Sequence, residues 1–559
     1  MENSISAQRD LFSGQPIFSD MLLARKFVSH GIQAAWHTGY AGRGASMLEG
    51  VRGDFAVGMK LQNGNVFLAV DRFAIRSLCY RINGNSLIFG ERADDVAGSG
   101  GEIDPQAIYD YLYFHFIPSP RTIFKDVYRL PPGHYALFEN GKLTMERYWV
   151  PKFVESSNVN FDSMRDEFRD LLKLSVSKLL DGSKPACFLS GGTDSSTVAG
   201  MIGEACGKAA ATYSIGFDAE GFDEMEFARI AARHFGTEHH EYYVTPEDLV
   251  RSIPEVARYY DQPFGNSSAL PAYYCAKMAR EDGVTRILAG DGGDELFGGN
   301  TRYAKQKLFG FYDAIPATLR RSLIDPVLLE TPLGRAPLLK KAASYIRQAK
   351  IPLPDRTQTY NLMSRLGVNE VLTSSFLERI DLCEPMLQQK AIWRQGGLAS
   401  QINLELAFDW RYTLAECDLP KVVGTTTLAG IQVAFPMLGD ELVDFSMRLP
   451  SNYKLNGLKL RWFFKEALRG FLPNEIITKK KKGFGLPFGI WAAKHPALKA
   501  LAEDSVRVLV DRKIMRAEFV DALFGRHLNE HPTYYGEMIW ISMMLAQWLG
   551  RSPSPAQRF

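Results

Sequence analysis

Residues 186–196 read ACFLSGGTDSS, a short apolar run that passes through two glycines into the helix-like stretch SSTVAGMIGEA (195–205). The glycines let the backbone approach a ligand closely, and free N–H groups at a helix N-terminus favour an anion there. The stretch lacks the Gly-Lys-Ser/Thr ending of a Walker A loop. A carboxylate inside a phosphate-binding turn would repel phosphate, so the sequence predicts a bridging Mg²⁺ at Asp194. The alternative is an ordinary glycine turn before a helix.

Strands and helices alternate after this turn. The apolar run ATYSIGF (211–217) precedes the helical stretch EMEFARIAARHFG (224–236), and TRILAG (285–290) ends at a second glycine-rich turn. This alternation predicts a parallel, doubly wound sheet. Residues 300–420 are helical in pattern and rich in Leu, Ala, Lys and Arg.

The N-terminal part of the chain has a different pattern. Residues 50–150 contain short apolar runs separated by turn residues such as Asn63-Gly64 and Asn83-Gly84, which is typical of antiparallel strands. At 559 residues the chain is too long for one ordinary domain. We therefore predict two domains, 1–150 and 160–559.

A second glycine-rich string, AGDGGDELFGG (289–299), follows the third predicted strand. The carboxyl ends of the strands in an open parallel sheet share one crevice. This topology would place Leu189–Ser195, Ile215–Phe217 and Ala289–Asp294 around one ligand. Two aspartates facing a phosphate site suit one metal ligand and one acid/base group. The glycines imply close backbone packing, which argues against a solvated acidic turn.

Composition indicates a cytoplasmic enzyme. The net charge of +2 gives no reason to expect a nucleic acid or a membrane surface as partner. The N-terminus does not resemble a secretory signal, and no stretch approaches the roughly 18–20 apolar residues of a membrane span. The cysteines are scattered without a C-x-x-C pair, which argues against a zinc site or a disulfide framework. They are Cys79, Cys187, Cys206, Cys275, Cys383 and Cys417.

SGGTDSS resembles the pyrophosphatase loop of the asparagine synthetases and their relatives, the β-lactam synthetases and lasso-peptide cyclases. GDGGDELFGG is similar to the second signature of that family, and further matches lie at 213–217, 237–241 and 481–484. The resemblance implies an α/β protein with an N-terminal Ntn-hydrolase-like (glutaminase-like) β-rich domain. An adenine-nucleotide-alpha-hydrolase-like doubly wound parallel sheet with a helical extension would follow. The implied activity is ATP-dependent, AMP-forming amide-bond synthesis by a carbon–nitrogen ligase.

The resemblance also implies residue roles. Asp194 and Asp294 would hold Mg²⁺, and Asp291 would be the general base. Lys481 would stabilise negative charge at the reacting acyl group or phosphate, although the four lysines 479–482 could also form a solvated loop. ATP binding falls to Leu189, Ser190, Gly191, Gly192, Asp194, Ser195, Ile215, Ala289 and Gly290.

The sequence departs from the family in its glutaminase-like half. Glutamine-dependent members carry a cysteine directly after the initiator Met, but residue 2 here is Glu and the first cysteine is Cys79, within an apparent strand. Only 52 residues precede Gly53, so the glutamine pocket is also shortened. We therefore expect a degenerate domain that does not hydrolyse glutamine. Whether a further segment precedes residue 1 is left open.

A second departure concerns the substrate. The family usually has Glu where Gln432 stands and Arg where Ala434 stands. The loss of both charges weakens the case for aspartate as the acyl substrate, and Gln432 is either a substrate-facing residue or a structural one. The expected reactants are a small-molecule or peptide carboxylate and an amine or ammonia, with an ammonia-supplying or substrate-presenting protein left open.

Three alternatives stand beside amide synthesis between two substrates. One is an intramolecular amide cyclase of the lasso-peptide cyclase or β-lactam synthetase kind, and another is a non-catalytic nucleotide-binding homologue. A third, a related thiolase acting on RNA, is disfavoured by the near-neutral charge and by the absence of C-x-x-C pairs.

Overall fold

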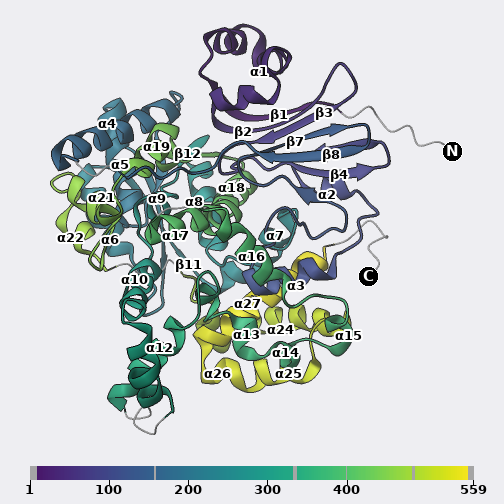
Figure 1. Cartoon of the computed structure of the whole chain (residues 1–559), viewed down its shortest axis with the longest axis vertical. Helices are drawn as coiled ribbons and strands as arrows, with labels where there is room; N and C mark the ends of the chain where they lie inside the picture. Colours follow the sequence, from purple (N-terminus) through teal and green to yellow (C-terminus); the bar gives the residue numbers. More distant parts are fainter. Residues whose placement is uncertain (1–8, 156–158, 331–336, 398–399, 481–484, 552–559) are drawn as a thin grey trace.

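The computed structural model describes residues 9–155, 159–330, 337–397, 400–480 and 485–551. A β-rich part is followed by a parallel sheet surrounded by helices, as Figure 1 shows. The fold class predicted from the sequence is confirmed. The boundary between residues 150 and 160 remains a prediction.

The β-rich part is built around one antiparallel sheet with the strand order β1-β2-β3-β7-β8. Side chains alternate along its strands: Phe55 and Val57 belong to the core under helix α1 (Met21–Arg43), whereas Leu68 and Val70 belong to the core under the second sheet. That second sheet has the order β5-β4-β6. The strands are β1 (Leu11–Phe18), β2 (Val51–Lys60), β3 (Val66–Val70), β4 (Cys79–Asn83), β5 (Ser86–Gly90), β6 (Tyr128–Arg129), β7 (His134–Glu139) and β8 (Lys142–Arg147).

Strand β1 and helix α1 (Met21–Arg43) were not expected from the sequence. The strand LFSGQPIF contains a glycine and a proline, which obscure the strand pattern, and proline is tolerated there because β1 is an edge strand. The helix starts at Asp20, whose side chain accepts hydrogen bonds from the N–H groups of Leu22 and Leu23. It bends at Gly31, where φ is 83°.

The parallel sheet has the strand order β11-β10-β9-β12-β13. Its inner strand β10, ATYSIGF, is buried along its whole length, as expected for a parallel strand covered on both faces. The strands are β9 (Ala186–Phe188), β10 (Ala211–Phe217), β11 (Glu238–Val244), β12 (Arg286–Leu288) and β13 (Gln432–Ala434). The region 300–420, predicted to be largely helical, is largely helical in its described residues.

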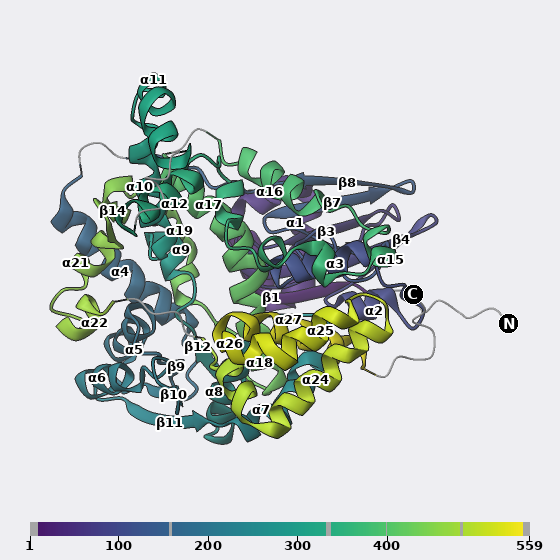
Figure 2. The same ribbon diagram turned by 90° about the horizontal axis from the view of Figure 1, so that it is seen from below.

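Helices cover both faces of this sheet, and α10 and α12 project from it as an arm, as Figures 1 and 2 show from two sides. The helices next to the sheet are α4 (Phe161–Leu179), α5 (Thr193–Cys206), α6 (Met225–Phe235), α7 (Pro246–Tyr259), α8 (Ala269–Glu281), α9 (Gly293–Phe297), α18 (Leu419–Leu428) and α19 (Asp440–Arg448). The helices of the extension and the C-terminal part are α10 (Thr301–Asp313), α12 (Pro337–Ala349), α16 (Glu384–Arg394), α17 (Gln401–Asp409), α20 (Ser451–Lys454), α21 (Trp462–Ala467), α22 (Asn474–Thr478), α23 (Phe488–Lys494), α24 (Pro496–Asp511) and α27 (Pro532–Leu549). Among the described helices, none is both long and apolar enough to cross a membrane.

The two parts share one hydrophobic core. Residues of helix α3 (Pro105–Phe114) and of α27 belong to the same buried cluster, and the Tyr111 hydroxyl donates a hydrogen bond to the Ile541 carbonyl at 2.8 Å. An ion pair between Arg129 and Asp261 also crosses the interface at 2.9 Å. The β-rich part is therefore packed against the helices around the parallel sheet.

Candidate active site

The turn from β9 into α5 has the shape that its glycines predict. Gly191 lies at φ 66°, where a side chain would be strained and would meet helix α6. The Ser195 hydroxyl accepts a hydrogen bond from the Ser190 backbone N–H at 3.1 Å, and the two serine hydroxyls lie 3.0 Å apart. These bonds close the turn and leave the first N–H groups of α5 without intrahelical partners. The turn therefore offers donors for an anion.

The two glycine-rich strings meet at the carboxyl edge of the sheet. A Cβ atom on Gly290 would lie 2.9 Å from the Ser195 nitrogen and 3.0 Å from the Asp194 carbonyl carbon. Only glycine at position 290 lets the two backbones come this close. The structure thus brings together two of the three segments that the sequence predicted to share a crevice, Leu189–Ser195 and Ala289–Asp294.

Two of the residues predicted to hold adenosine, Leu189 and Ala289, directly follow β9 and β12, and the third, Ile215, lies within β10. Leu189, Ile215 and Ala289 are all buried. The Leu189 N–H donates to the Tyr213 carbonyl at 3.0 Å, and the Ala289 N–H donates to the Ala434 carbonyl at 2.9 Å. Both N–H groups are used by the sheet, and the adenosine-binding role stays a prediction.

Asp194 and Asp294 converge on one positive group, the guanidinium of Arg461. Its Nη1 lies 2.9 Å from Asp194 Oδ2 and 2.7 Å from Asp294 Oδ1, and its Nη2 pairs with Asp194 Oδ1. The same Nη1 donates to the Thr193 hydroxyl at 2.9 Å. Burial opposes the charge on Arg461, but Asp194 and Asp294 outweigh it and raise its pKa. Sequence reasoning missed this arginine, which precedes α21.

Two glycines of the second string make room for this cluster. A Cβ atom on Gly293 would overlap the Asp194 carboxylate and lie 3.0 Å from Arg461 Nη2. One on Gly299 would overlap the Asp294 carboxylate and come within 2.5 Å of Arg461 Cδ. The crowding of glycines in GDGGDELFGG therefore has a packing cause.

Asp291 faces a second cation, Lys421 at the start of α18. The Lys421 ammonium lies 3.2 Å from Asp291 Oδ1 and 3.3 Å from Asp418 Oδ1. Burial opposes the ammonium charge, but Asp291 and Asp418 raise the pKa of Lys421. Burial also raises the pKa of Asp418, while Lys421 counteracts it. Neither Lys421 nor Asp418 was singled out from the sequence.

Comparison with known proteins identifies the chain. The family description "Asparagine synthase" matches residues 167–550, which is more than half of the chain and contains the whole cluster described above. The chain belongs to the asparagine synthase family. A second description, "Glutamine amidotransferase domain", matches residues 26–149. Membership of this family makes the chain a carbon–nitrogen ligase homologue.

Several curated relatives resemble it over most of its length. A "Putative asparagine synthetase [glutamine-hydrolyzing]" of Mycobacterium tuberculosis is 28% identical over 480 residues, covering 83% of this chain and 72% of that protein. "Asparagine synthetase [glutamine-hydrolyzing] 1" of Bacillus subtilis is 27% identical over 446 residues, covering 79% and 69%. "Amidase chry2" of Gibberella zeae is 23% identical over 503 residues, covering 81% and 72%.

Of the four consecutive lysines 479–482, the structure describes Lys479 and Lys480. Lys481 lies outside the described residues together with Lys482, Gly483 and Phe484, and its catalytic role stays a prediction. Lys479 is not the solvated lysine that a run of lysines suggests, because its side chain is only 8% exposed. Its ammonium lies 3.0 Å from Glu224 Oε2 and donates to the Gly191 carbonyl at 3.3 Å. Lys479 therefore connects this segment to the glycine turn between β9 and α5.

Gln432 lies at the opposite end of the sheet from the carboxylate cluster. It is the first residue of β13, opposite Arg286, and its Oε1 accepts a hydrogen bond from Arg286 Nη2 at 2.9 Å. It lines a cavity of about 540 Å³ that also includes Arg76 from the β-rich part. This placement favours the structural alternative for Gln432, and a contact with substrate stays a prediction.

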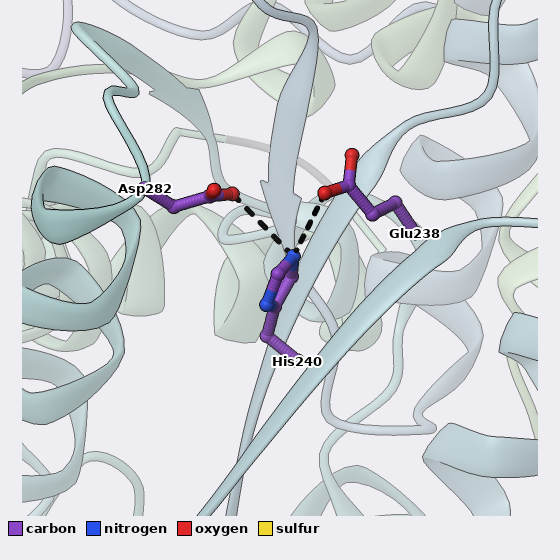
Figure 3. A group of neighbouring side chains, drawn as sticks. All are labelled: Glu238, His240 and Asp282. Carbon is purple, nitrogen blue, oxygen red and sulfur yellow. Dashed lines mark hydrogen bonds and ion pairs between the residues drawn. The ribbon is translucent and has the colours of Figure 1, made fainter.

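A further group of possible metal ligands also lies toward the amino end of the sheet. Figure 3 shows His240 between the carboxylates of Glu238 and Asp282, at 3.3 and 3.4 Å. The ammonium of Lys184 pairs with the same two carboxylates at 3.0 and 2.7 Å. A protein cation thus already offsets part of the negative charge of this group, which we interpret as a surface ion-pair network.

Proposed function

We propose that this chain synthesises an amide bond from a carboxylate and an amine or ammonia, converting ATP to AMP and pyrophosphate through an acyl-adenylate. The observation that carries the proposal is the convergence of Asp194 and Asp294 on one positive group. This positive group, the Arg461 guanidinium, lies at the glycine turn between β9 and α5. Asp291 stands in the same glycine-rich string as Asp294. The names of the relatives, asparagine synthetases and an amidase, support amide chemistry.

In the first half of the reaction, a carboxylate oxygen would attack the α-phosphorus of ATP and pyrophosphate would leave. The N–H groups at the start of α5 and the serine hydroxyls of Ser190 and Ser195 would bind the pyrophosphate. Asp194 and Asp294 would hold Mg²⁺, which supplies positive charge at the phosphates when bound. Their fit to a cation is supported by the arginine that they already bind.

In the second half, the amine nitrogen would attack the acyl carbon and AMP would leave. Asp291 would accept the amine proton, a role that requires it to be ionised before the attack. The Lys421 ammonium lies 3.2 Å from Asp291 Oδ1 and holds the carboxylate in place. Lys421 and Asp418 are thus positioning residues for Asp291.

We propose further that the β-rich part does not hydrolyse glutamine. Its cysteine, Cys79, is fully buried in β4, and burial raises the pKa of its thiol to about 11. A thiol with this pKa is almost entirely protonated at neutral pH and is a poor nucleophile. The ammonia or amine would therefore come from outside this part of the chain.

The test uses the full-length protein with ATP, Mg²⁺, ammonium and a panel of amino-acid and peptide carboxylates. AMP and pyrophosphate should form together with the amide, and Asp194→Ala or Asp294→Ala should lower the rate by at least about 10³-fold. Asp218→Ala, at an exposed aspartate just after β10, is the matched control and should retain activity. Formation of ADP instead of AMP, or either variant keeping more than about a tenth of the activity, would contradict the proposal.

The nitrogen source is tested in the same assay. Ammonium should support amide formation, while glutamine should yield neither glutamate nor amide with this chain alone. Equal turnover with glutamine and ammonium would show that the β-rich part has a nucleophile other than Cys79.

A further inference from the structure

The guanidinium of Arg461 occupies the position where the two metal-binding aspartates converge. Three carboxylate oxygens of Asp194 and Asp294, together with the Thr193 hydroxyl, surround it. Its side chain is only 6% exposed. An arginine stays charged under all ordinary conditions, so this position holds a permanent positive charge.

The surrounding structure fixes Arg461 in this place. Its backbone is left-handed, with φ 53° and ψ 38°, a conformation that is unfavourable for a bulky side chain. Its N–H donates to the Gly298 carbonyl at 3.2 Å, and its guanidinium carbon lies 4.2 Å from the centroid of the Phe464 ring. Its Nε atom is buried and has no hydrogen-bond partner among the described residues. A strained backbone and an unsatisfied donor are tolerated here, which indicates that the position of this charge matters.

A divalent cation and this guanidinium cannot occupy the same position, because both are positive and both need the same carboxylate oxygens. We propose that Arg461 is an internal cation that fills the metal site of the nucleotide-free protein and is displaced when Mg²⁺ enters with the nucleotide. The phosphate oxygens of ATP bring the extra negative charge that makes the exchange favourable. Free Mg²⁺ should compete poorly with Arg461, so metal binding becomes dependent on nucleotide.

This exchange also explains why two aspartates can face each other before substrate binds, with side chains that are only 19% and 22% exposed. Partly buried carboxylates without a counter-charge would repel each other and destabilise the site. Arg461 supplies that charge, and its planar fork can reach both carboxylates at once, which a lysine ammonium cannot do as well. The inference rests on the proposed function only in naming Mg²⁺·ATP as the natural ligand.

The experiment measures Mn²⁺ binding to the full-length protein by electron paramagnetic resonance, without nucleotide or substrate. Wild type should bind Mn²⁺ at this site only when α,β-methylene-ATP is added. Arg461→Gln should bind Mn²⁺ without nucleotide at least about tenfold more tightly than wild type. Arg461→Lys should show a smaller gain, because it keeps a charge but loses the fork.

Two control variants show whether the additional Mn²⁺ binding of Arg461→Gln occurs at the two aspartates. Arg469→Gln removes an exposed arginine that pairs with Glu466 and should leave Mn²⁺ binding unchanged. Adding Asp294→Asn to Arg461→Gln should abolish the gain, because it removes one of the two carboxylates. Persistence of the gain in this double variant would place the metal elsewhere and overturn the inference.

Wild type alone also decides the question if the Arg461 variants fail to fold. Mn²⁺ binding by wild type that is equally tight with and without the nucleotide analogue would overturn the inference. The measurement needs no turnover, so its outcome is independent of whether any carboxylate is a substrate. Failure of the AMP assay with unchanged nucleotide-dependent Mn²⁺ binding would reject the proposed function alone.

Discussion

Replacing Lys421 should impair only the second half of the proposed reaction, in which the amine attacks the acyl carbon. Its ammonium is paired with Asp291 and Asp418 and contacts neither Asp194 nor Asp294 among the described ion pairs. Lys421→Met should therefore lower amide formation by roughly 10²-fold or more, as for loss of one electrostatic stabiliser, while pyrophosphate still forms. Pyrophosphate exchange and amide formation, measured on the same sample, check this.

The matched variants for this prediction are Asp291→Asn and Lys421→Arg. Asp291→Asn should behave like Lys421→Met and form pyrophosphate but little amide. Lys421→Arg should restore part of the amide formation because it keeps the positive charge. Normal amide formation by Lys421→Met would show that Asp291 does not depend on this cation.

At the scale of elements, the end of α22 and the turn before α5 form one unit through Lys479. Its buried pair with Glu224 and its bond to the Gly191 carbonyl should make Lys479→Met costly, on the order of 2 kcal/mol in stability, because Glu224 would lose its counter-charge. The apparent affinity for ATP should fall with it, because the turn loses an anchor. Thermal unfolding and nucleotide titration measure the two effects.

The neighbouring Lys480 is exposed and provides the control. Lys480→Met should leave both measurements nearly unchanged, and Lys479→Arg should recover most of the loss. If Lys479→Met and Lys480→Met behave alike, the interpretation of the lysines 479–482 as a solvated loop is favoured. Lys481→Met in the same series tests the catalytic role predicted for that lysine.

Another element-scale feature is the continuous helical run through α17, a π-helix (Trp410–Asp418) and α18. The wider turns of the π-helix set the directions of Arg411, Glu416 and Asp418, and insertions of this kind are frequent at functional sites. Glu416 accepts hydrogen bonds from the backbone and hydroxyl of Ser119 in the β-rich part, at 3.2 and 2.6 Å. The same helical run thus contacts both Asp291, through Lys421, and the other part of the protein.

At the scale of the whole molecule, the Arg129–Asp261 ion pair couples the two parts. Burial opposes ionisation of Asp261, but Arg129, the Ala93 backbone N–H and Arg92 together lower the pKa of Asp261 below its ordinary 3.8. A lowered carboxyl pKa stabilises the fold above pH 3.8, and this stabilisation is lost as the pH falls through the lower folded-state value. Arg129→Met should therefore cost on the order of 3 kcal/mol at neutral pH and make the unfolding transition less dependent on acid.

Calorimetry and circular dichroism across pH measure this effect, and wild type should unfold in one transition because its parts share a core. Lys125→Met is the control, since its pair with Glu102 is more than half exposed on both sides and should contribute less than about 1 kcal/mol. Equal losses in the two variants would show that the buried pair does not couple the parts.

The sequence by itself determined the local architecture. A strand, a glycine turn and a helix follow one another in ACFLSGGTDSS because apolar residues, glycines and helix formers stand in that order, and their repetition predicted the parallel sheet. Rules for parallel sheets then placed Asp194 and Gly290 near one another. Strand β1 and helix α1 escaped prediction, because Gly14 and Pro16 obscure the strand pattern and only pairing with β2 makes β1 an edge strand.

Only the tertiary structure decided which charges meet. Arg461 is 267 residues from Asp194, Lys421 is 130 residues from Asp291, and Lys479 is 288 residues from Gly191. Nothing in the local pattern of an arginine or lysine reveals a distant carboxylate, because such a contact depends on how the helices pack around the sheet. Burial then makes these contacts strong by excluding water, and burial is likewise a property of the folded molecule rather than of any segment.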